Sequence, residues 1–222
     1  MPSATIRNYL ERGLAFSQGY GMTEAAPGAL YLARDMSSAK AGTAGVPHFF
    51  TDVRVVDTDG HEVGDGEKGE ITVSGPNVMR GYWGRAEDTA SVVDADGWFH
   101  SGAVGVTDEG RYVSIVDRIK EVIISGGENI YPAEVESVLY DHPAVAECAV
   151  IGVPDEKWGE VGRALVALKP GASADEPELL DFLRERLAKY KVPKTVVLVD
   201  ALPRNATGKI LTKTIRARYG KS

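Results

Sequence analysis

The chain has 222 residues, of which 43% are hydrophobic and 26% charged, an ordinary composition for a globular protein of one large domain or two modest ones. Its formal net charge of -7 argues against a nucleic-acid partner, because nucleic-acid-binding proteins present positive surfaces. The single cysteine, Cys148, excludes an internal disulfide framework, and no apolar run approaches the roughly 18 residues of a membrane span. The N-terminus lacks a signal-peptide pattern, so a cytoplasmic protein is expected.

The first half of the chain predicts one helix followed by short strands. Apolar residues recur at helical spacing over residues 4–14, and Gly13 closes this helix. Residues 35–47 hold few large apolar groups and predict an extended loop. Period-two patterns predict strands at residues 53–57, 69–76 and 112–116. Short strands joined by Gly and Asp turns are typical of a small barrel or sandwich.

The second half of the chain predicts a mixture of strands and helices. Strands are predicted at residues 121–125, 145–153, 163–169 and 195–199. One helix begins near Pro132, and a short basic helix is predicted at residues 212–219. Another helix is predicted from the apolar stripe Leu179, Leu183, Leu187 and Tyr190. Strands and helices around a small sheet indicate an α+β fold for residues 118–222.

Positive charge gathers at the C-terminal end of the chain. From residue 184 to residue 222 there are 11 Lys and Arg residues, against only Glu185 and Asp200. A basic tail on an acidic protein indicates a local partner that carries phosphates or carboxylates. From charge alone, a solvated helix face explains the same residues equally well.

Five short motifs follow one another along the chain. They are Tyr20-Gly21-Met22-Thr23-Glu24, Gly81-Tyr82-Trp83, Asp96-Gly97-Trp98-Phe99, the run from Asp117 to Glu136, and the segment from Pro203 to Lys209. This series resembles the adenylate-forming ligases, and it is most similar to AMP-forming acyl-CoA synthetases of the fatty-acid and aryl-acid type. The last segment is not a P-loop, because Pro203 stands where that motif needs Gly and Ile210 where it needs Ser or Thr.

The resemblance implies an enzyme that joins a carboxylic acid to CoA with ATP as the energy source. The acid and MgATP give an acyl-adenylate and pyrophosphate, and the CoA thiolate then releases AMP and forms the thioester. Implied ligands are therefore ATP or AMP, Mg²⁺ and CoA. The resemblance also implies that residues 1–117 are the end of a large adenylating domain and that residues 118–222 are a small mobile domain.

The family's phosphate loop and most of its acyl pocket have no match in this sequence. The isolated chain is therefore expected to have little or no complete synthetase activity. A large-domain sheet that is cut in this way exposes an edge, so association with a second copy of the chain is expected to cover it.

The resemblance assigns roles to residues of the adenylation step. Lys209 is expected to be catalytic, since an ammonium group offsets the repulsion between a carboxylate and the α-phosphate. Tyr20 is expected to stack on the adenine, Gly21 to belong to the nucleotide-binding site, and Thr23 to contact phosphate oxygens. Glu24 is expected to hold Mg²⁺, which prefers carboxylate oxygens. The alternative for the segment from Tyr20 to Glu24 is a polar turn with a half-buried tyrosine.

The resemblance assigns further roles around the predicted domain boundary. Asp117 is expected to be the hinge, and Arg118 is expected to approach the ribose or the phosphates. Gly126 and Gly127 are expected to line the CoA channel, where a side chain would block the pantetheine arm. Lys191 is a candidate for the CoA phosphates. The alternatives are an ordinary turn at Asp117 and a hairpin that needs positive φ at the two glycines.

One position departs from the family pattern. The segment Ser101-Gly102-Ala103 ends in Ala where the family carries an Asp that binds the ribose hydroxyls. Loss of that acceptor is expected to cost about 2–3 kcal/mol, a factor of roughly 30 to 150 in nucleotide affinity. A non-catalytic nucleotide- or CoA-binding module therefore remains an alternative function.

The other aromatic, histidine and cysteine residues receive no catalytic role. Trp83 and Trp98 are expected to pack rather than to bind a ligand. The four histidines show no metal-ligand spacing. Cys148 lies in an apolar run and is expected to be a buried strand residue.

Overall fold

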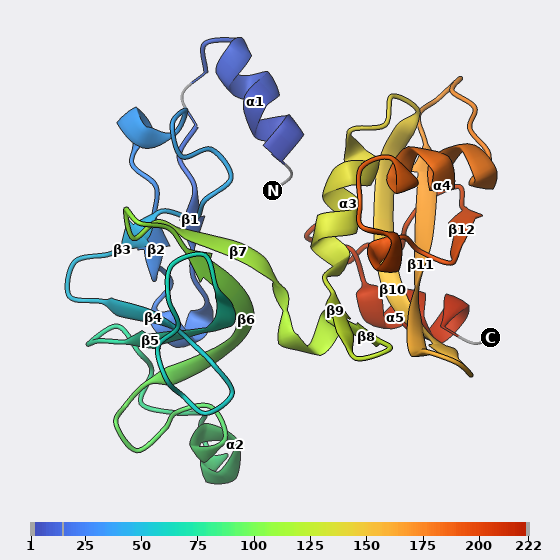
Figure 1. The fold of residues 1–222 in the computed structure, drawn as a ribbon. Coiled ribbons are helices and arrows are strands. Elements are labelled where there is room, and N and C mark those ends of the chain that lie inside the picture. Colours follow the sequence, from blue (N-terminus) through green and yellow to red (C-terminus); the bar gives the residue numbers. More distant parts are fainter. Residues whose placement is uncertain (1–2, 15, 221–222) are drawn as a thin grey trace. The chain divides into compact units, whose positions relative to one another are not determined.

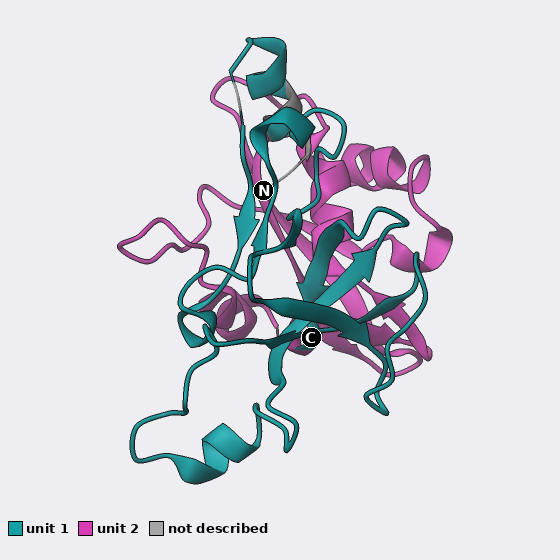
Figure 2. Ribbon diagram, turned by 90° about the vertical axis from the view of Figure 1, so that its left-hand side faces the viewer, with its two compact units in different colours: residues 1–119 teal, residues 120–222 magenta. Residues whose placement is uncertain are grey.

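The protein is described from a computed structural model that covers residues 3–14 and 16–220 (Figure 1). The chain divides into two compact units, residues 1–119 and 120–222, which Figure 2 shows in separate colours. Each unit has its own hydrophobic core. The boundary expected from the sequence lies after residue 117, and the boundary between the units lies after Ile119.

Unit 1 begins with the helix α1 (Ser3–Glu11), as the sequence predicts. Gly13 ends this helix with a φ of +73°. Its N–H donates to the carbonyl of Leu10 at 2.9 Å, and the N–H of Leu14 donates to the carbonyl of Tyr9 at 3.1 Å. A left-handed glycine at this place satisfies carbonyl groups that the helix end leaves open.

A small antiparallel sheet follows α1. Its strands are β1 (Gly19–Tyr20), β2 (Leu30–Tyr31) and β3 (Val46–Pro47), in that order. The single-turn 3₁₀ helix η1 (Thr23–Ala25) lies between β1 and β2, and a second one, η2 (Arg34–Met36), begins the predicted loop. The motif from Tyr20 to Glu24 therefore runs from an edge strand into a tight helical turn.

The larger sheet of unit 1 is antiparallel in the order β4-β5-β6-β7. Its strands are β4 (Asp52–Val56), β5 (Lys68–Ser74), β6 (Phe99–Thr107) and β7 (Val113–Arg118). Within the described residues it stays open and does not close into a barrel. Buried Val55, Ile71 and Val73 form part of its core, and the helix α2 (Ala86–Ala90) lies in the connection between β5 and β6.

Unit 2 is built on a five-stranded sheet. Four of its strands follow the order β10-β11-β8-β9, all antiparallel, and β12 pairs in parallel with β11. The strands are β8 (Ile123–Ser125), β9 (Glu128–Ile130), β10 (Val145–Asp155), β11 (Gly159–Leu168) and β12 (Thr195–Leu198). The helices are α3 (Pro132–Tyr140), α4 (Glu176–Arg184) and α5 (Thr212–Tyr219), with 3₁₀ turns η3 (Ile119–Glu121) and η4 (Lys189–Lys191).

Both faces of the unit 2 sheet are covered. Successive side chains of a strand point to opposite faces, so Cys148 joins the core beneath α3 and α4 whereas Ala149 joins the core beneath α5. Ile215 of α5 is fully buried against that second face. Together with the sheets of unit 1, this arrangement confirms the predicted α+β class, and it confirms that Cys148 is a buried strand residue.

The helix α4 is shorter than the apolar stripe indicates. It begins at the N-cap Asp175, whose side chain accepts a hydrogen bond from the N–H of Glu178 at 2.9 Å, and it ends at Arg184. Tyr190 was predicted on this helix, but it lies in the separate turn η4. The prediction of one helix through Tyr190 was wrong because a turn after α4 happened to preserve the spacing.

Candidate functional site

The end of β1 and the middle of β6 meet at one place in unit 1. The side chain of Tyr20 packs against the core that contains Ala103, and Ser101 is near enough to act on the Tyr20 hydroxyl from 81 positions later in the chain. Burial raises the pKa of Tyr20, whereas the Ser101 contact and the positive charge of Arg118 lower it. Tyr20 and Arg118, two of the residues predicted at the nucleotide, therefore lie close enough to influence each other.

Ser101, Gly102 and Ala103 form a bulge in β6. The register passes from Thr72↔His100 to Glu70↔Val104, so three residues of β6 lie opposite Ile71 alone. The Ser101 hydroxyl donates to the carbonyl of Ile71 at 2.6 Å. Bulges of this kind interrupt a ladder and re-aim side chains beside functional sites.

Ala103, the position that departs from the family pattern, lies at the end of this bulge. Its side chain is buried, and its backbone pairs with that of Arg118 on β7. The structure therefore brings Tyr20, Ala103 and Arg118 into one cluster.

The turn that carries Gly21, Thr23 and Glu24 is closely packed. A Cβ atom on Gly21 would lie 1.5 Å from the carbonyl oxygen of Pro27, so only glycine fits there. Thr23 is exposed at the start of η1. The Glu24 Oε1 accepts a hydrogen bond from the hydroxyl of Tyr82 at 2.9 Å, and this contact raises the pKa of Tyr82.

Asp117 and Arg118 end the last strand of unit 1. The Oδ1 of Asp117 accepts a hydrogen bond from the N–H of Arg118 at 2.7 Å, and the boundary between the units follows one residue after Arg118. Asp117 therefore lies where a hinge is expected, but its role in a rotation stays a prediction.

In unit 2, Gly126 and Gly127 form the turn of the β8–β9 hairpin. Their φ values are +60° and +89°, and a backbone with positive φ favours glycine because a Cβ atom would strain it. The turn itself therefore explains both glycines. The N–H of Gly126 donates to the carbonyl of Trp158 at 2.8 Å. A Cβ on Gly126 would meet the Trp158 ring at 2.6 Å, whereas a Cβ on Gly127 would meet nothing within 4 Å.

A cavity of about 600 Å³ opens beside this hairpin. Its apolar walls include Ile130, Trp158 and Tyr190, and the ammonium-bearing residues Lys189 and Lys194 also line it. Of the residues that line the cavity, the resemblance assigned a role to Gly126 and none to the two aromatic residues. An apolar cavity with a few charged groups at its margin has the general form of a small-molecule site.

Lys191 does not line this cavity. Its Nζ lies 2.6 Å from Glu134 Oε1, and the hydrogen bond to Glu134 raises the pKa of Lys191. Lys194, which does line the cavity, is paired with Asp155 at 2.5 Å. The predicted contact between Lys191 and a CoA phosphate stays a prediction.

The segment that holds Lys209 is a loop organised by Asn205. The Oδ1 of Asn205 accepts from the N–H and the hydroxyl of Thr207 at 3.1 and 2.8 Å, and from the N–H of Lys209 at 2.8 Å. Arg204 anchors the loop through Glu147 Oε1 at 2.7 Å. The backbone of Lys209 is therefore fixed while its side chain is exposed.

Two further observations concern residues without a predicted role. Trp83 is fully exposed, so the expectation that it packs was wrong, whereas Trp98 lies against Arg54 with 4.0 Å from ring centroid to guanidinium.

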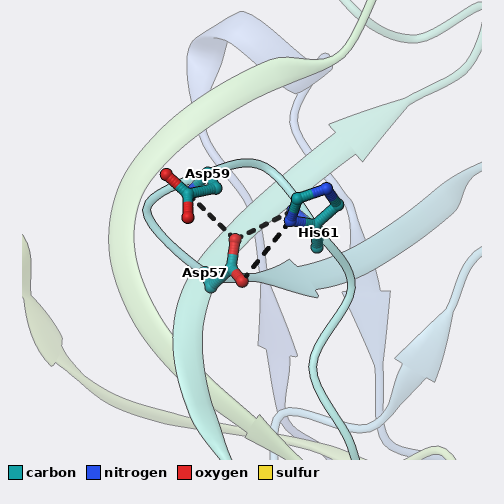
Figure 3. A group of neighbouring side chains, drawn as sticks. All are labelled: Asp57, Asp59 and His61. Atoms are coloured by element: carbon teal, nitrogen blue, oxygen red, sulfur yellow. Dashed lines mark hydrogen bonds and ion pairs between the residues drawn. The ribbon is translucent and has the colours of Figure 1, made fainter.

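Figure 3 shows Asp57, Asp59 and His61 close together on the exposed turn after β4. The Oδ1 of Asp57 accepts hydrogen bonds from the N–H groups of Asp59 and His61, both at 2.9 Å. These bonds close the turn and explain why the three residues lie close together.

Over residues 3–14 and 16–220, the structure contains no helix with the length and apolar character required to traverse a bilayer.

Comparison with known proteins matches two family models to the chain. The model described as AMP-binding enzyme matches residues 1–83, and the model described as AMP-binding enzyme C-terminal domain matches residues 134–209. The chain is 60% identical over 220 residues to the feruloyl-CoA synthase of Amycolatopsis sp, covering 99% of this chain and 45% of that protein. It is 49% identical over 221 residues to the 2-succinylbenzoate–CoA ligase of Geobacillus kaustophilus, and the match covers 100% of this chain and 45% of that protein.

Solved structures agree with these matches. The ATP-bound MatB of Rhodopseudomonas palustris superposes with a TM-score of 0.93 at 40% identity, covering 98% of this chain and 43% of that one. The o-succinylbenzoate CoA synthetase MenE of Bacillus subtilis, in complex with its acyl-adenylate intermediate, superposes with a TM-score of 0.88 at 42% identity. This match covers 97% of this chain and 44% of that one. The chain thus spans less than half the length of the relatives it matches. Over that span, it belongs to the AMP-binding enzymes, the family of these acyl-CoA synthetases and CoA ligases.

Proposed function

We propose that this chain provides part of the active site of an AMP-forming ligase that joins a carboxylic acid to CoA. The observation that carries the proposal is the cluster of Tyr20, Ala103 and Arg118, in which β1 meets the paired strands β6 and β7. In this proposal the Tyr20 ring faces the adenine and Arg118 approaches the ribose or the phosphates. Sequence identity of 60% to a feruloyl-CoA synthase supports the same chemistry.

Glu24 is proposed to hold Mg²⁺ and Thr23 to contact phosphate oxygens. A carboxylate oxygen suits a hard cation, which keeps several of its own waters. Tyr82 donates to Oε1 of Glu24, and the proposal assigns the other oxygen, Oε2, to the metal. The bound ion would neutralise phosphate charge. The MenE relative has been solved with ATP and a magnesium ion, which supports this fit.

Lys209 is proposed to be the catalytic lysine of the adenylation step. The carboxylate of the acid attacks the α-phosphorus, pyrophosphate leaves, and the ammonium group offsets the charge that the two anions bring together. The fixed backbone and exposed side chain of Lys209 suit a group that must reach into a site on another part of the enzyme. Asp117 is proposed to be the residue at which unit 2 turns between the two half-reactions.

The second half-reaction is proposed to use the cavity beside the β8–β9 hairpin. The CoA thiolate attacks the acyl carbonyl carbon, and AMP is the leaving group. We place part of the CoA molecule against Gly126, Trp158 and Lys189, because this cavity combines apolar walls with positive charge. Gly127 belongs to the same turn, and Lys191 is proposed as a further cation near the phosphates.

An aryl acid is proposed as the substrate class, with fatty acids as the alternative. The feruloyl-CoA synthase is 60% identical to the chain, compared with 43% for a long-chain-fatty-acid–CoA ligase of Mycobacterium tuberculosis. A second hollow of about 390 Å³ adjoins Tyr20 and is lined by Tyr31 and His48, whose rings lie 5.8 Å apart. Planar groups of this kind favour an aromatic ligand.

A complementation experiment tests the proposed ligase. The purified chain is mixed with the preceding portion of the feruloyl-CoA synthase, and AMP release is measured with ferulate, MgATP and CoA. The 222 residues alone are expected to give little turnover, and the mixture is expected to restore it. Lys209→Ala should abolish the restored activity, whereas the control Lys213→Ala, another exposed lysine, should not.

The alternative function is a non-catalytic module that binds a nucleotide or CoA. Calorimetric titration with AMP and with CoA separates the two functions when it is combined with complementation. Binding without any restored turnover favours the module. Turnover that Lys209→Ala leaves unchanged contradicts the ligase proposal.

Self-association is a separate proposal. Phe49 and Phe50 are 93% and 83% exposed, and side chains of this kind favour contact with a second copy. Light scattering over a range of concentrations tests it, and a monomer at every concentration contradicts it.

A further inference from the structure

Glu70 of β5 holds the backbone of the bulge from Ser101 to Ala103. Its Oε1 accepts a hydrogen bond from the N–H of Gly102 at 2.8 Å. Gly102 has a φ of +67°, so the bulge turns sharply at the residue that Glu70 contacts. The Glu70 side chain is only 21% exposed, which strengthens a contact to a carboxylate.

The second oxygen of Glu70 contacts His100. The distance from Glu70 Oε2 to His100 Nδ1 is 2.8 Å, and the ring's Nε2 lies 3.7 Å from Asp94 Oδ2. Because an ionised carboxylate only accepts, Nδ1 carries the hydrogen in this contact. Glu70 thus joins the residue before the bulge, His100, to the residue at its centre, Gly102.

The bulge in turn holds Tyr20. The Ser101 hydroxyl donates to the carbonyl of Ile71, and its oxygen accepts from the N–H of Ala103 at 3.2 Å. The Tyr20 side chain packs against the core that contains Ala103. Glu70 itself is near enough for its negative charge to act on the phenol of Tyr20. A continuous chain of contacts therefore runs from Glu70 through the bulge to the tyrosine.

We propose that Glu70 is a positioning residue of the nucleotide site, supported by His100, which fixes the Ser101–Ala103 bulge and through it the place of Tyr20. The inference rests on the proposed function, because it assumes that Tyr20 faces the nucleotide. Without Glu70, the N–H of Gly102 loses its acceptor and the two extra residues of β6 lose the group that holds their shape. The bulge, with Ala103 at its end, then shifts beneath Tyr20, and the ring no longer has a fixed position for stacking.

Two pairs of variants separate the contacts. Glu70→Gln keeps an oxygen for Gly102 but removes the charge, whereas Glu70→Ala removes both contacts. His100→Asn keeps a donor near the place of Nδ1, whereas His100→Leu removes it. Glu67→Gln is the matched control, since Glu67 also accepts from a backbone N–H, that of Gly64 at 3.0 Å, but in a turn away from the bulge.

The first readout is calorimetric titration of the 222-residue chain and its variants with AMP. Glu70→Ala is expected to weaken AMP binding about tenfold, the effect of one lost hydrogen bond. Glu70→Gln and His100→Leu should weaken it less, and His100→Asn should restore the affinity that His100→Leu loses. CoA binding, which is proposed for unit 2, should not change in any of them. Unaltered AMP affinity in Glu70→Ala contradicts the proposal.

The second readout does not depend on nucleotide binding. The ring-carbon NMR signal of Tyr20, assigned with Tyr20→Phe, is followed through an alkaline titration. Removal of the negative charge in Glu70→Gln should lower the pKa of Tyr20, and Glu67→Gln should leave it unchanged. If the unmodified chain binds no AMP, the proposal that this chain contributes to a nucleotide site fails. The titration of Tyr20 still decides whether Glu70 positions Tyr20. An unchanged Tyr20 signal in both Glu70 variants overturns the proposal.

Discussion

The hydroxyl of Tyr82 donates a hydrogen bond of 2.9 Å to Oε1 of Glu24, across 58 positions of the chain. The carbonyl of Glu24 also accepts from the N–H of Met79 at 2.8 Å. The carboxylate proposed for Mg²⁺ is thus oriented by the segment that follows β5. The motif around Gly81-Tyr82-Trp83 gains a physical reason from this contact, because one of its side chains sets the direction of another motif's carboxylate.

Replacement of Glu24 by Gln should remove the magnesium-dependent part of ATP binding. A neutral amide is a poorer ligand than a carboxylate for a hard cation, so ATP affinity in the presence of Mg²⁺ should fall at least about tenfold. AMP binding without metal should be unchanged. Calorimetry with and without Mg²⁺ measures both quantities. Tyr82→Phe, which keeps the carboxylate, is the control and should retain the magnesium dependence.

Glu24→Gln has a second expected effect, which concerns the pKa of Tyr82. The contact with Glu24 raises the pKa of Tyr82, so Glu24→Gln should lower it. A spectroscopic titration of the phenol measures this, and an unchanged midpoint would show that the contact does not persist in solution.

Replacement of Ala103 by Asp should tighten AMP binding. Ala103 lies beside Arg118 in the β6–β7 ladder, so the new carboxylate gains both a neighbouring cation and ribose hydroxyls as partners. The expected gain is about 2–3 kcal/mol, or roughly 30- to 150-fold. Ala103→Asn, of similar size but without charge, is the control and should gain less. Equal affinity in Ala103→Asp and the unmodified chain contradicts the assignment of this position.

Much of the candidate site could be proposed from the sequence because its residues lie in contiguous motifs. Gly21 shows why this works: its requirement is local, set by the Pro27 carbonyl six residues later. Glu70 was not predicted, since its contact with Gly102 depends on a bulge in β6. That strand was missed altogether, because Gly102 and Gly105 break the apolar alternation that reveals strands.

The cavity residues of unit 2 illustrate the same limit. Trp158 follows a turn in which Asp155 accepts from its N–H at 3.0 Å, and nothing in the local sequence indicates that its ring covers Gly126. Tyr190 was placed on a helix by its spacing, whereas the turn η4 brings it to the cavity. Long-range contacts of this kind become visible only when the strand register is known.

The two glycines of the β8–β9 hairpin should differ in their tolerance of alanine. Both have positive φ, so both substitutions strain the backbone by about 1 kcal/mol. Only Gly126→Ala also drives a Cβ into the Trp158 ring, which should add about 1–2 kcal/mol. Urea unfolding of the two variants measures the difference, and Gly127→Ala serves as the control for backbone strain. Equal stability of the two variants would contradict the packing of Trp158 on this turn.

Cys148 should make the stability of unit 2 depend on alkaline pH. Burial, and to a lesser extent the charge of Glu136, raises the pKa of this thiol far above its usual value of about 8.5. The folded form thus keeps its proton while the unfolded form releases it. This contribution to stability is full below about pH 8.5 and is lost as the pH rises, by up to about 1.4 kcal/mol per pH unit.

The comparison with Cys148→Ala isolates this effect. Urea unfolding at several pH values between 7 and 10 should give a smaller decline for the variant than for the unmodified chain. The same burial predicts that a thiol reagent modifies Cys148 only as fast as unit 2 opens. Rapid modification of the folded chain at neutral pH, or identical declines for both proteins, would contradict a buried thiol.

Replacement of Asn205 by Ala should impair adenylation without unfolding the chain. Asn205 Oδ1 collects three hydrogen bonds from Thr207 and Lys209, so its loss frees the backbone that directs the lysine. The loop is exposed, so the melting temperature should change little. The AMP-release rate in the complementation assay should fall about 10- to 100-fold, since a small displacement of a catalytic group has a large kinetic effect. Asn205→Asp, which keeps the accepting oxygen, should retain most of the rate; a rate unchanged in Asn205→Ala would show that Lys209 reaches its target without this loop.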